Sequence, residues 1–314
     1  MTTLSLLFGL LLLLLGGDSI VKAASGLAQR FKLSPFATGM FLVAFATSIP
    51  ELAVNTRAYF TGSQNLALGN AVGSNIVNFG LTLGVAALVA PLTIRWRALS
   101  PLLLCLMVGT IATVALGYDG VLSRIEGIVF LVAFVAVVAF AMMRSRSESP
   151  EVKQELAEYE STNDGLGRNA LRFAIGAVAL YYGAYYVVKH APVLGQALGM
   201  TPLLTGLTIV AIGTALPEVV TAAIAARRGQ GDIVAGHVVG SSLFNLLAIL
   251  GGMAALRDLP IPASFVRFEL PAALAFSLLL YPMLRRDLHI SRGEGAVLVL
   301  ALVAWLAFEF ALIG

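Results

Sequence analysis

The sequence GTALPEVV at residues 213–220 nearly repeats ATSIPELA at residues 46–53. The similarity extends outward without a gap, since 17 of the 50 residues from Pro35 to Gly84 recur 167 positions later, from Pro202 to Gly251. Most of the shared residues are Gly, Pro, Thr, Ser, Glu and Asn, whereas a compositional bias would favour Leu, Ala and Val. The chain therefore contains an internal duplication.

The composition is that of a polytopic membrane protein. The chain is 59% hydrophobic and 12% charged, with a mean hydropathy of +0.91, whereas soluble domains carry roughly 25% charged residues. The net charge of +3 comes from basic residues in short loops, where they set orientation, so we expect no nucleic-acid partner. The apolar N-terminal run precedes the first basic residue, Lys22, which favours a transmembrane helix over a signal peptide. The single cysteine, Cys105, excludes an intrachain disulfide.

Ten apolar runs are long enough to cross a bilayer, which takes about 20 residues. They lie at residues 3–23, 35–60, 65–90, 99–117, 122–143, 168–190, 202–226, 232–255, 268–284 and 294–313. We therefore predict an all-α membrane protein with two five-helix repeats, at residues 1–143 and 168–314, and a cytoplasmic linker at residues 144–167. The duplicated motifs occupy residues 39–84 and 206–251.

An odd number of spans in each repeat predicts that the second repeat crosses the membrane with the opposite orientation. Inverted repeats of this kind are the architecture of many secondary transporters. With both termini outside, 15 of the 20 basic residues fall on the cytoplasmic side, as the positive-inside rule requires. The short loops suit a prokaryotic inner membrane.

Two prolines interrupt equivalent spans. Pro50 and Pro217 each remove a backbone donor and leave the carbonyl four residues earlier, at Ala46 and Gly213, without its helical partner. Such a carbonyl is tolerated in a membrane only where protein, water or an ion satisfies it. We therefore predict broken helices that offer oxygen ligands to a cation.

The two glutamates that follow these prolines are the leading candidates for a functional site. An ionised residue at bilayer depth is expensive and is by default a functional hypothesis. Glu51 and Glu218 occupy equivalent positions of the duplication, so we expect them to converge, and their summed charge of −2 matches one divalent cation.

The next span of each repeat adds neutral oxygen ligands. Ser74 with Asn78, and Ser241 with Asn245, are four residues apart and hence share a helical face. Carboxylates, amides, hydroxyls and carbonyls form a hard-ligand set, which favours Ca2+ or Na+ over zinc or copper.

The paired motifs, ATSIPEL with GNAVGSNIVN and GTALPEV with GHVVGSSLFN, resemble those of the cation/calcium exchanger superfamily, typified by sodium/calcium exchangers with two alpha repeats. The resemblance implies exchange of several Na+ for each Ca2+ by alternating access, with a gating bundle built partly from the first and sixth helices. It also implies cation ligands at Glu51, Glu218, Asn78, Asn245, Ser74, Ser241, Thr47, Thr214 and Ser48, and at the backbone carbonyls of Ala44 and Ala211.

Several positions depart from the family pattern. Ala46 replaces the usual glycine, Ala215 lacks a hydroxyl that is common there, His237 replaces a frequent Asn, and Asn245 stands where potassium-dependent members have Asp. The missing hydroxyl at Ala215 leaves Na+ coupling open, so an H+-coupled Ca2+ antiporter, working by protonation of Glu51 and Glu218, is the alternative. We expect His237 to be a packed, neutral side chain, although a pH-sensing role is open.

We therefore expect an antiporter of Na+ and Ca2+ with no enzymatic activity, no cofactor and no protein partner. No nucleophile and base arrangement or nucleotide-binding loop is present in the sequence. A non-transporting, cation-sensing membrane protein is a further alternative from a different class. Glu309, in the last span, is expected to reach the outer interface.

Overall fold

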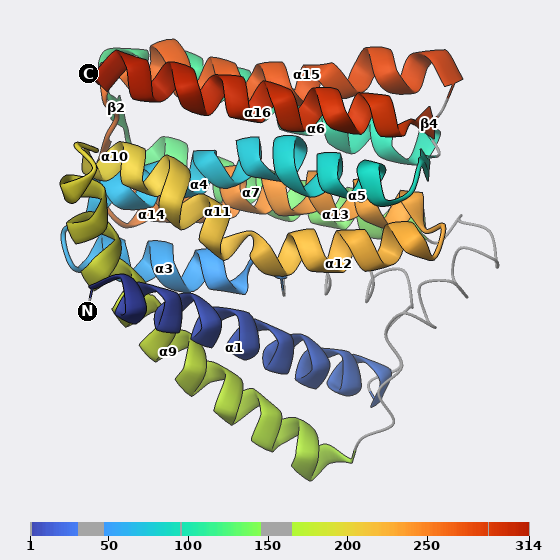
Figure 1. The fold of residues 1–314 in the computed structure, drawn as a ribbon, viewed down its shortest axis with the longest axis horizontal. Coiled ribbons are helices and arrows are strands. Elements are labelled where there is room, and N and C mark those ends of the chain that lie inside the picture. The colour runs from blue at the N-terminus through green and yellow to red at the C-terminus, as the bar shows by residue number, and fades with distance from the viewer. Residues whose placement is uncertain (1, 31–46, 95, 146–164, 288, 314) are drawn as a thin grey trace.

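The computed structural model describes residues 2–30, 47–94, 96–145, 165–287 and 289–313, and these residues are almost entirely helical (Figure 1). The first half of the chain forms α1 (Thr2–Arg30), α3 (Ile49–Phe60), α4 (Gln64–Val77), the π-helix η2 (Asn78–Leu83), α5 (Gly84–Val89), β1 (Leu92–Thr93), α6 (Trp96–Leu116), the 3-10 helix η3 (Gly117–Asp119), β2 (Val121–Leu122) and α7 (Arg124–Ser145).

The second half has the same order of long helices and strands. It forms α9 (Leu166–Ala197), α10 (Pro202–Thr205), the π-helix η4 (Gly206–Val210), α11 (Ala211–Thr214), α12 (Leu216–Arg227), α13 (Gly231–Leu243), the π-helix η5 (Phe244–Leu250), α14 (Gly251–Leu256), β3 (Leu259–Pro260), the π-helix η6 (Phe265–Glu269), α15 (Leu270–Asp287), β4 (His289–Ile290) and α16 (Arg292–Ile313).

The described helices are those of an integral membrane protein. Eight of them are long and apolar enough to cross a bilayer, and the pair 202–214 and 216–227, bent by 44° at a short break, forms a ninth candidate span. The tenth predicted span, at residues 35–60, lies partly outside the described residues, which cover it only from Thr47 onward.

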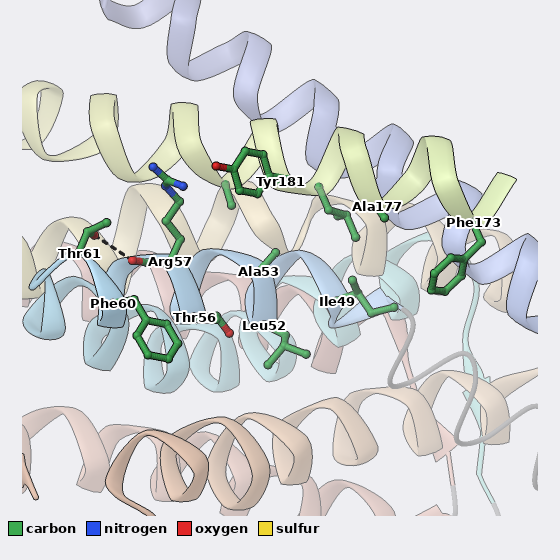
Figure 2. A pocket seen from close by; sticks show the side chains of 12 residues that line it. Ile49, Leu52, Ala53, Thr56, Arg57, Phe60, Thr61, Phe173, Ala177 and Tyr181 are labelled. Atoms are coloured by element: carbon green, nitrogen blue, oxygen red, sulfur yellow. Dashed lines mark hydrogen bonds between the residues drawn. The ribbon is translucent and has the colours of Figure 1, made fainter. Parts of the chain in front are cut away.

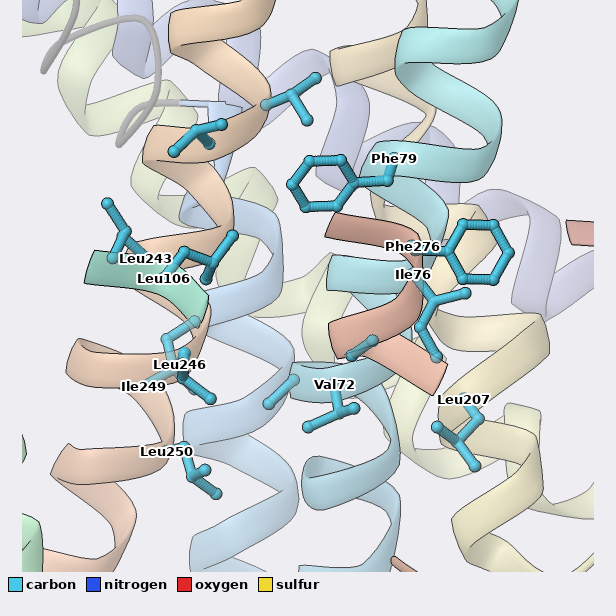
Figure 3. Packing of buried hydrophobic residues seen from close by; sticks show 14 of the residues in the cluster. Val72, Ile76, Phe79, Leu106, Leu207, Leu243, Leu246, Ile249, Leu250 and Phe276 are labelled. Atoms are coloured by element: carbon cyan, nitrogen blue, oxygen red, sulfur yellow. The ribbon is translucent and has the colours of Figure 1, made fainter. Parts of the chain in front are cut away.

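Two spans form the centre of the helical bundle. In the continuous helices Gln64–Val89 and Gly231–Leu256, 78% of the residues of the apolar 18-residue segment are buried. In the other unbroken candidate spans, this share is 17% to 44%. Figure 3 shows large apolar side chains of these central spans, with Ile76 and Phe79 beside Phe276 of α15; Leu246 belongs to the same buried cluster. These two spans therefore form the core against which the other helices pack.

Two short antiparallel ladders join the halves of the chain. β1 pairs with β4, and β2 pairs with β3. β1 and β3 are themselves equivalent, since residues 92–93 and 259–260 are 167 apart. In each ladder, the strand that follows the third predicted span of one half therefore pairs with the strand that precedes the last span of the other half.

The last span of each half begins with the same capping box. The carboxylate of Glu126 accepts hydrogen bonds from the backbone amide and hydroxyl of Ser123, both at 2.7 Å. Glu294 and Ser291 make the same pair of bonds at 2.7 and 2.8 Å. These residues are 168 apart rather than 167, so the duplication continues into the last spans after a slip of one residue.

The helices α1 and α9 pack closely on each other and lie side by side along one edge of the bundle, opposite α15 and α16 (Figure 1). Glycines permit the close approach: a Cβ on Gly16 would lie 3.0 Å from the carbonyl oxygen of Gly176, and a Cβ on Gly183 would lie 2.9 Å from that of Gly9. Small residues serve this purpose between membrane helices.

Candidate functional site

The predicted helix breaks are centred on Ser48 and Ala215. These equivalent residues have nearly the same backbone, with φ −84° and ψ 5° for Ser48 and φ −80° and ψ −2° for Ala215. Each is the N-cap of the helix that follows, which places Pro50 and Pro217 in its first turn, where a missing N–H costs nothing. The broken helix is confirmed in the second half, and in the first half the segment before Thr47 lies outside the described residues.

The same geometry places both glutamates at the N-terminus of a helix. Glu51 and Glu218 lie in the first turns of α3 and α12, where the backbone amides carry positive partial charge, and each is only 1% exposed. The two carboxylates lie close enough to interact with each other. The sequence expectation that they converge is therefore met.

Each carboxylate also contacts a hydroxyl from the other half of the chain. Glu51 contacts the Thr214 hydroxyl, and Glu218 contacts the Thr47 hydroxyl. Glu218 also contacts the Ser48 hydroxyl. One oxygen of each carboxylate, Oε2, is buried without a hydrogen-bond partner in the described part of the chain.

Each of these two threonines also contacts a second polar side chain in the other half of the chain. Thr47 Oγ1 lies 2.8 Å from His237 Nε2, and Thr214 Oγ1 lies 3.3 Å from Asn70 Oδ1. Asn70 in turn donates from Nδ2 to Asn55 Oδ1 at 3.1 Å. These contacts were not predicted, although the equivalence of residues 70 and 237 in the duplication was a signal that could have revealed them.

The central spans meet beside the predicted ligands. Asn75 Nδ2 donates to the carbonyl oxygen of Ser242 at 3.2 Å, and these residues are equivalent, being 167 apart. Because a residue here contacts its own equivalent, this is a place where equivalent parts of the two halves meet. The neighbouring Ser74 and Ser241, predicted as ligands, are both fully buried.

The two asparagines predicted as ligands lie at the start of π-helical stretches. Asn78 is the first residue of η2 and Asn245 is the second residue of η5, and both are buried. A π-turn widens the helix and interrupts the regular bonding pattern, and such turns are frequent at functional sites. Both amide atoms of Asn245 are buried without a hydrogen-bond partner among the described residues.

The structure describes only one of the two predicted backbone ligands. Ala44 lies outside the described residues. The carbonyl oxygen of Ala211 accepts hydrogen bonds from the amide of Ala215 at 3.1 Å and from the hydroxyl of Thr214 at 3.4 Å.

The unpartnered atoms define the chemistry that this region can perform. Buried polar atoms without partners are rare and costly, yet several predicted ligands carry them: Ser48 Oγ, Glu51 Oε2, Ser74 Oγ, Glu218 Oε2 and Asn245 Oδ1. Across the described ranges, no three or more His, Cys, Asp or Glu side chains gather as a metal site. The arrangement suits an oxygen-coordinated cation.

Comparison with known proteins identifies the family. The model of the sodium/calcium exchanger protein family matches residues 1–143 and 169–311. The inner membrane protein YrbG of Escherichia coli is 35% identical over 320 residues, covering 99% of this chain and 97% of the relative. The sodium/calcium exchanger MaX1 of Methanosarcina acetivorans is 30% identical over 343 residues, covering 98% of each chain.

A solved structure shares the fold. The sodium-calcium exchanger NCX_Mj, soaked with Na+ and Sr2+, superposes with a TM-score of 0.70 at 28% identity, covering 98% of this chain and 99% of the other. With the matched motifs and the converging glutamates, these similarities show that the chain belongs to the sodium/calcium exchanger family of membrane antiporters.

Proposed function

We propose that the protein exchanges Na+ for Ca2+ across the membrane through the region around Glu51 and Glu218. The observation that carries this proposal is the pair of buried, interacting carboxylates, each with an oxygen that has no hydrogen-bond partner among the described residues. Two negative charges in a site of low polarity require a cation, and competition between one Ca2+ and Na+ ions for the same oxygens couples their movements.

The proposed cation ligands extend from the carboxylates to the surrounding oxygens. They are Glu51, Glu218, Asn78, Asn245, Ser74, Ser241, Thr47, Thr214, Ser48 and the backbone carbonyls of Ala44 and Ala211. The burial of every side chain that would supply a ligand supports the assignment. The contacts between the two halves also support the assignment, because they bring ligands from both halves to the ion.

We further infer ten spans in two inverted repeats, at residues 1–143 and 168–314, with a cytoplasmic linker at residues 144–167 and both termini outside. The reciprocal strand pairs and the contact of Asn75 with Ser242 support this arrangement, because exchange of equivalent elements is what a two-fold relation produces. The name of the Escherichia coli relative supports an inner-membrane location. The packed helices α1 and α9 would form the gating bundle of alternating access.

A second candidate keeps the site and replaces Na+ by H+. The same unpartnered oxygens of Glu51 and Glu218 favour it, since two close, buried carboxyls can hold protons when Ca2+ leaves. The absence of a hydroxyl at Ala215 removes one neutral ligand for Na+.

Transport by the purified protein in proteoliposomes distinguishes the candidates. Vesicles loaded with Na+ and diluted into Na+-free medium are compared with vesicles that carry only a pH gradient, and Ca2+ uptake is followed in both. Na+/Ca2+ exchange predicts uptake only in the first set. Uptake that follows the pH gradient and ignores Na+ would replace the proposal by the H+-coupled candidate. Glu309→Gln, which changes a buried carboxylate in α16, is the matched control and is expected to transport normally.

A further inference from the structure

An apolar groove lies between α3 and α9, on the opposite face of α3 from the central spans (Figure 2). Its volume is about 610 Å³, within the range of roughly 300–1,000 Å³ that is typical of ligand sites. Ile49, Leu52 and Phe60 line it from α3, and Phe173, Ala177 and Tyr181 line it from α9. Several of these side chains are exposed, among them Phe60 at 71% and Phe173 at 52%.

The groove has the length of one leaflet. Its lining residues recur every three or four positions along both helices, so it follows α3 from Ile49 to the residue after its end, Thr61. Twelve helical residues rise roughly 18 Å, and half of a bilayer's hydrocarbon core is about 15 Å. The end at Ile49 lies two residues from Glu51, and the end at Thr61 lies at the turn between α3 and α4.

The end of the groove near Thr61 is positively charged. The guanidinium of Arg57 lies 4.8 Å from the ring centre of Tyr185 and 5.5 Å from that of Tyr181. The ammonium of Lys189 lies 5.3 Å from the ring centre of Tyr185 and donates to its hydroxyl at 3.2 Å. The three α9 residues are four positions apart and therefore form one stripe that faces Arg57.

These two cations have no anionic partner among the described residues. α9 contains no Asp or Glu, and the groove is lined by none. A guanidinium stacked on aromatic rings keeps its N–H edge free, and that edge matches the oxygens of a phosphate. The equivalent of Arg57 in the second half of the chain is Ile224, so the charge is not a feature of the duplicated scaffold.

We propose that this groove binds one anionic phospholipid, with an acyl chain along α3 and α9 and the headgroup phosphate held by Arg57 and Lys189. The apolar lining fits the hydrocarbon chain of any lipid. The two unpaired cations distinguish among headgroups, because a zwitterionic lipid brings its own positive charge whereas an anionic one neutralises them.

Native mass spectrometry of the full-length protein in detergent tests the proposal. The probes are phosphatidylglycerol and phosphatidylcholine with the same acyl chains, added at equal concentrations. We expect the protein to retain phosphatidylglycerol about tenfold more strongly, and the double variant Arg57→Gln, Lys189→Gln to lose that preference. Arg257→Gln, which removes an exposed arginine remote from the groove in sequence, is the matched control and should keep the preference.

A second variant tests the groove itself. Ala177→Trp fills it with a bulky side chain on a surface that is exposed in the structure, so it should lower binding of both lipids while leaving the melting temperature unchanged. Equal retention of the two lipids by the unmodified protein, or an undiminished preference in the double variant, would overturn the proposal.

Discussion

Thr47 Oγ1 lies 2.8 Å from His237 Nε2, and these two residues come from different halves of the chain. Thr214 and Asn70 make the equivalent contact with the halves exchanged. When the imidazole proton is on Nδ1, Nε2 accepts the threonine proton, and the hydroxyl lone pairs then face away from the histidine. A ligand hydroxyl must present lone pairs to a cation, so His237 and Asn70 act as positioning residues for the proposed ligands.

This relationship makes His237 a sensitive position. His237→Leu removes the hydrogen-bond partner of Thr47 and should raise the Ca2+ concentration for half-maximal transport about fivefold to tenfold, since a lost hydrogen bond costs roughly 1 kcal/mol. His237→Asn, which places the residue of the first half in the second half, should preserve more of the affinity. Titration of Ca2+ in the transport assay measures both values, and equal effects of the two variants would contradict a positioning role.

The two glutamates should be individually indispensable for Ca2+ binding. Glu51→Gln and Glu218→Gln each remove one of the two charges that hold the cation, so Ca2+ affinity should fall by roughly a hundredfold or more. Isothermal titration calorimetry on the purified protein measures it, with a melting curve to show that each variant is folded. Glu309→Gln is the control, and a matching loss of affinity there would show that the effect is not specific to the site.

Restoring a hydroxyl at the second helix break should strengthen Na+ binding. Ala215 is equivalent to Ser48, whose buried hydroxyl lies beside the Glu218 carboxylate. Ala215→Ser would add a neutral oxygen ligand, and we expect the Na+ concentration for half-maximal exchange to fall several-fold, in line with about 1 kcal/mol for one polar contact. Ala226→Ser, a buried substitution near the end of α12, should leave it unchanged.

Close packing at Gly69 should be essential for stability. A Cβ there would collide with the backbone of Leu203 and Leu207, so Gly69→Ala must push the central span away from the broken helix and should cost about 1–3 kcal/mol. Gly252→Ala is the matched control, because no atom lies within 4 Å of its added Cβ. Thermal unfolding in detergent should show a lower melting temperature for the first variant only.

The sequence predicted the helical class, most spans, the broken helix and the burial of the two glutamates, because each depends on local composition or on motifs that survive in both halves. It missed the repeated capping boxes of Ser123 and Ser291, since a one-residue slip after Pro260 removes them from the constant offset of 167. Contacts such as that of Thr47 with His237 join residues 190 positions apart and depend on how the halves pack.

The expectation for Glu309 was wrong. This side chain is 5% exposed and does not reach solvent, and it lies close enough to Glu269 for their carboxylates to interact. The cause is packing between η6 and α16, where the rings of Phe268 and Phe308 lie 6.2 Å apart. A single hydrophobic helix with one acidic residue near its end does not reveal which neighbour will cover that residue.

Uptake of radioactive Ca2+ into proteoliposomes loaded with Na+ tests the central claim most directly, with Glu51→Gln measured in parallel. The account predicts uptake that requires the outward Na+ gradient, that is abolished when the gradient is collapsed, and that is absent in the variant. Uptake at the normal rate by folded Glu51→Gln would contradict the assignment of the transported Ca2+ to the paired carboxylates.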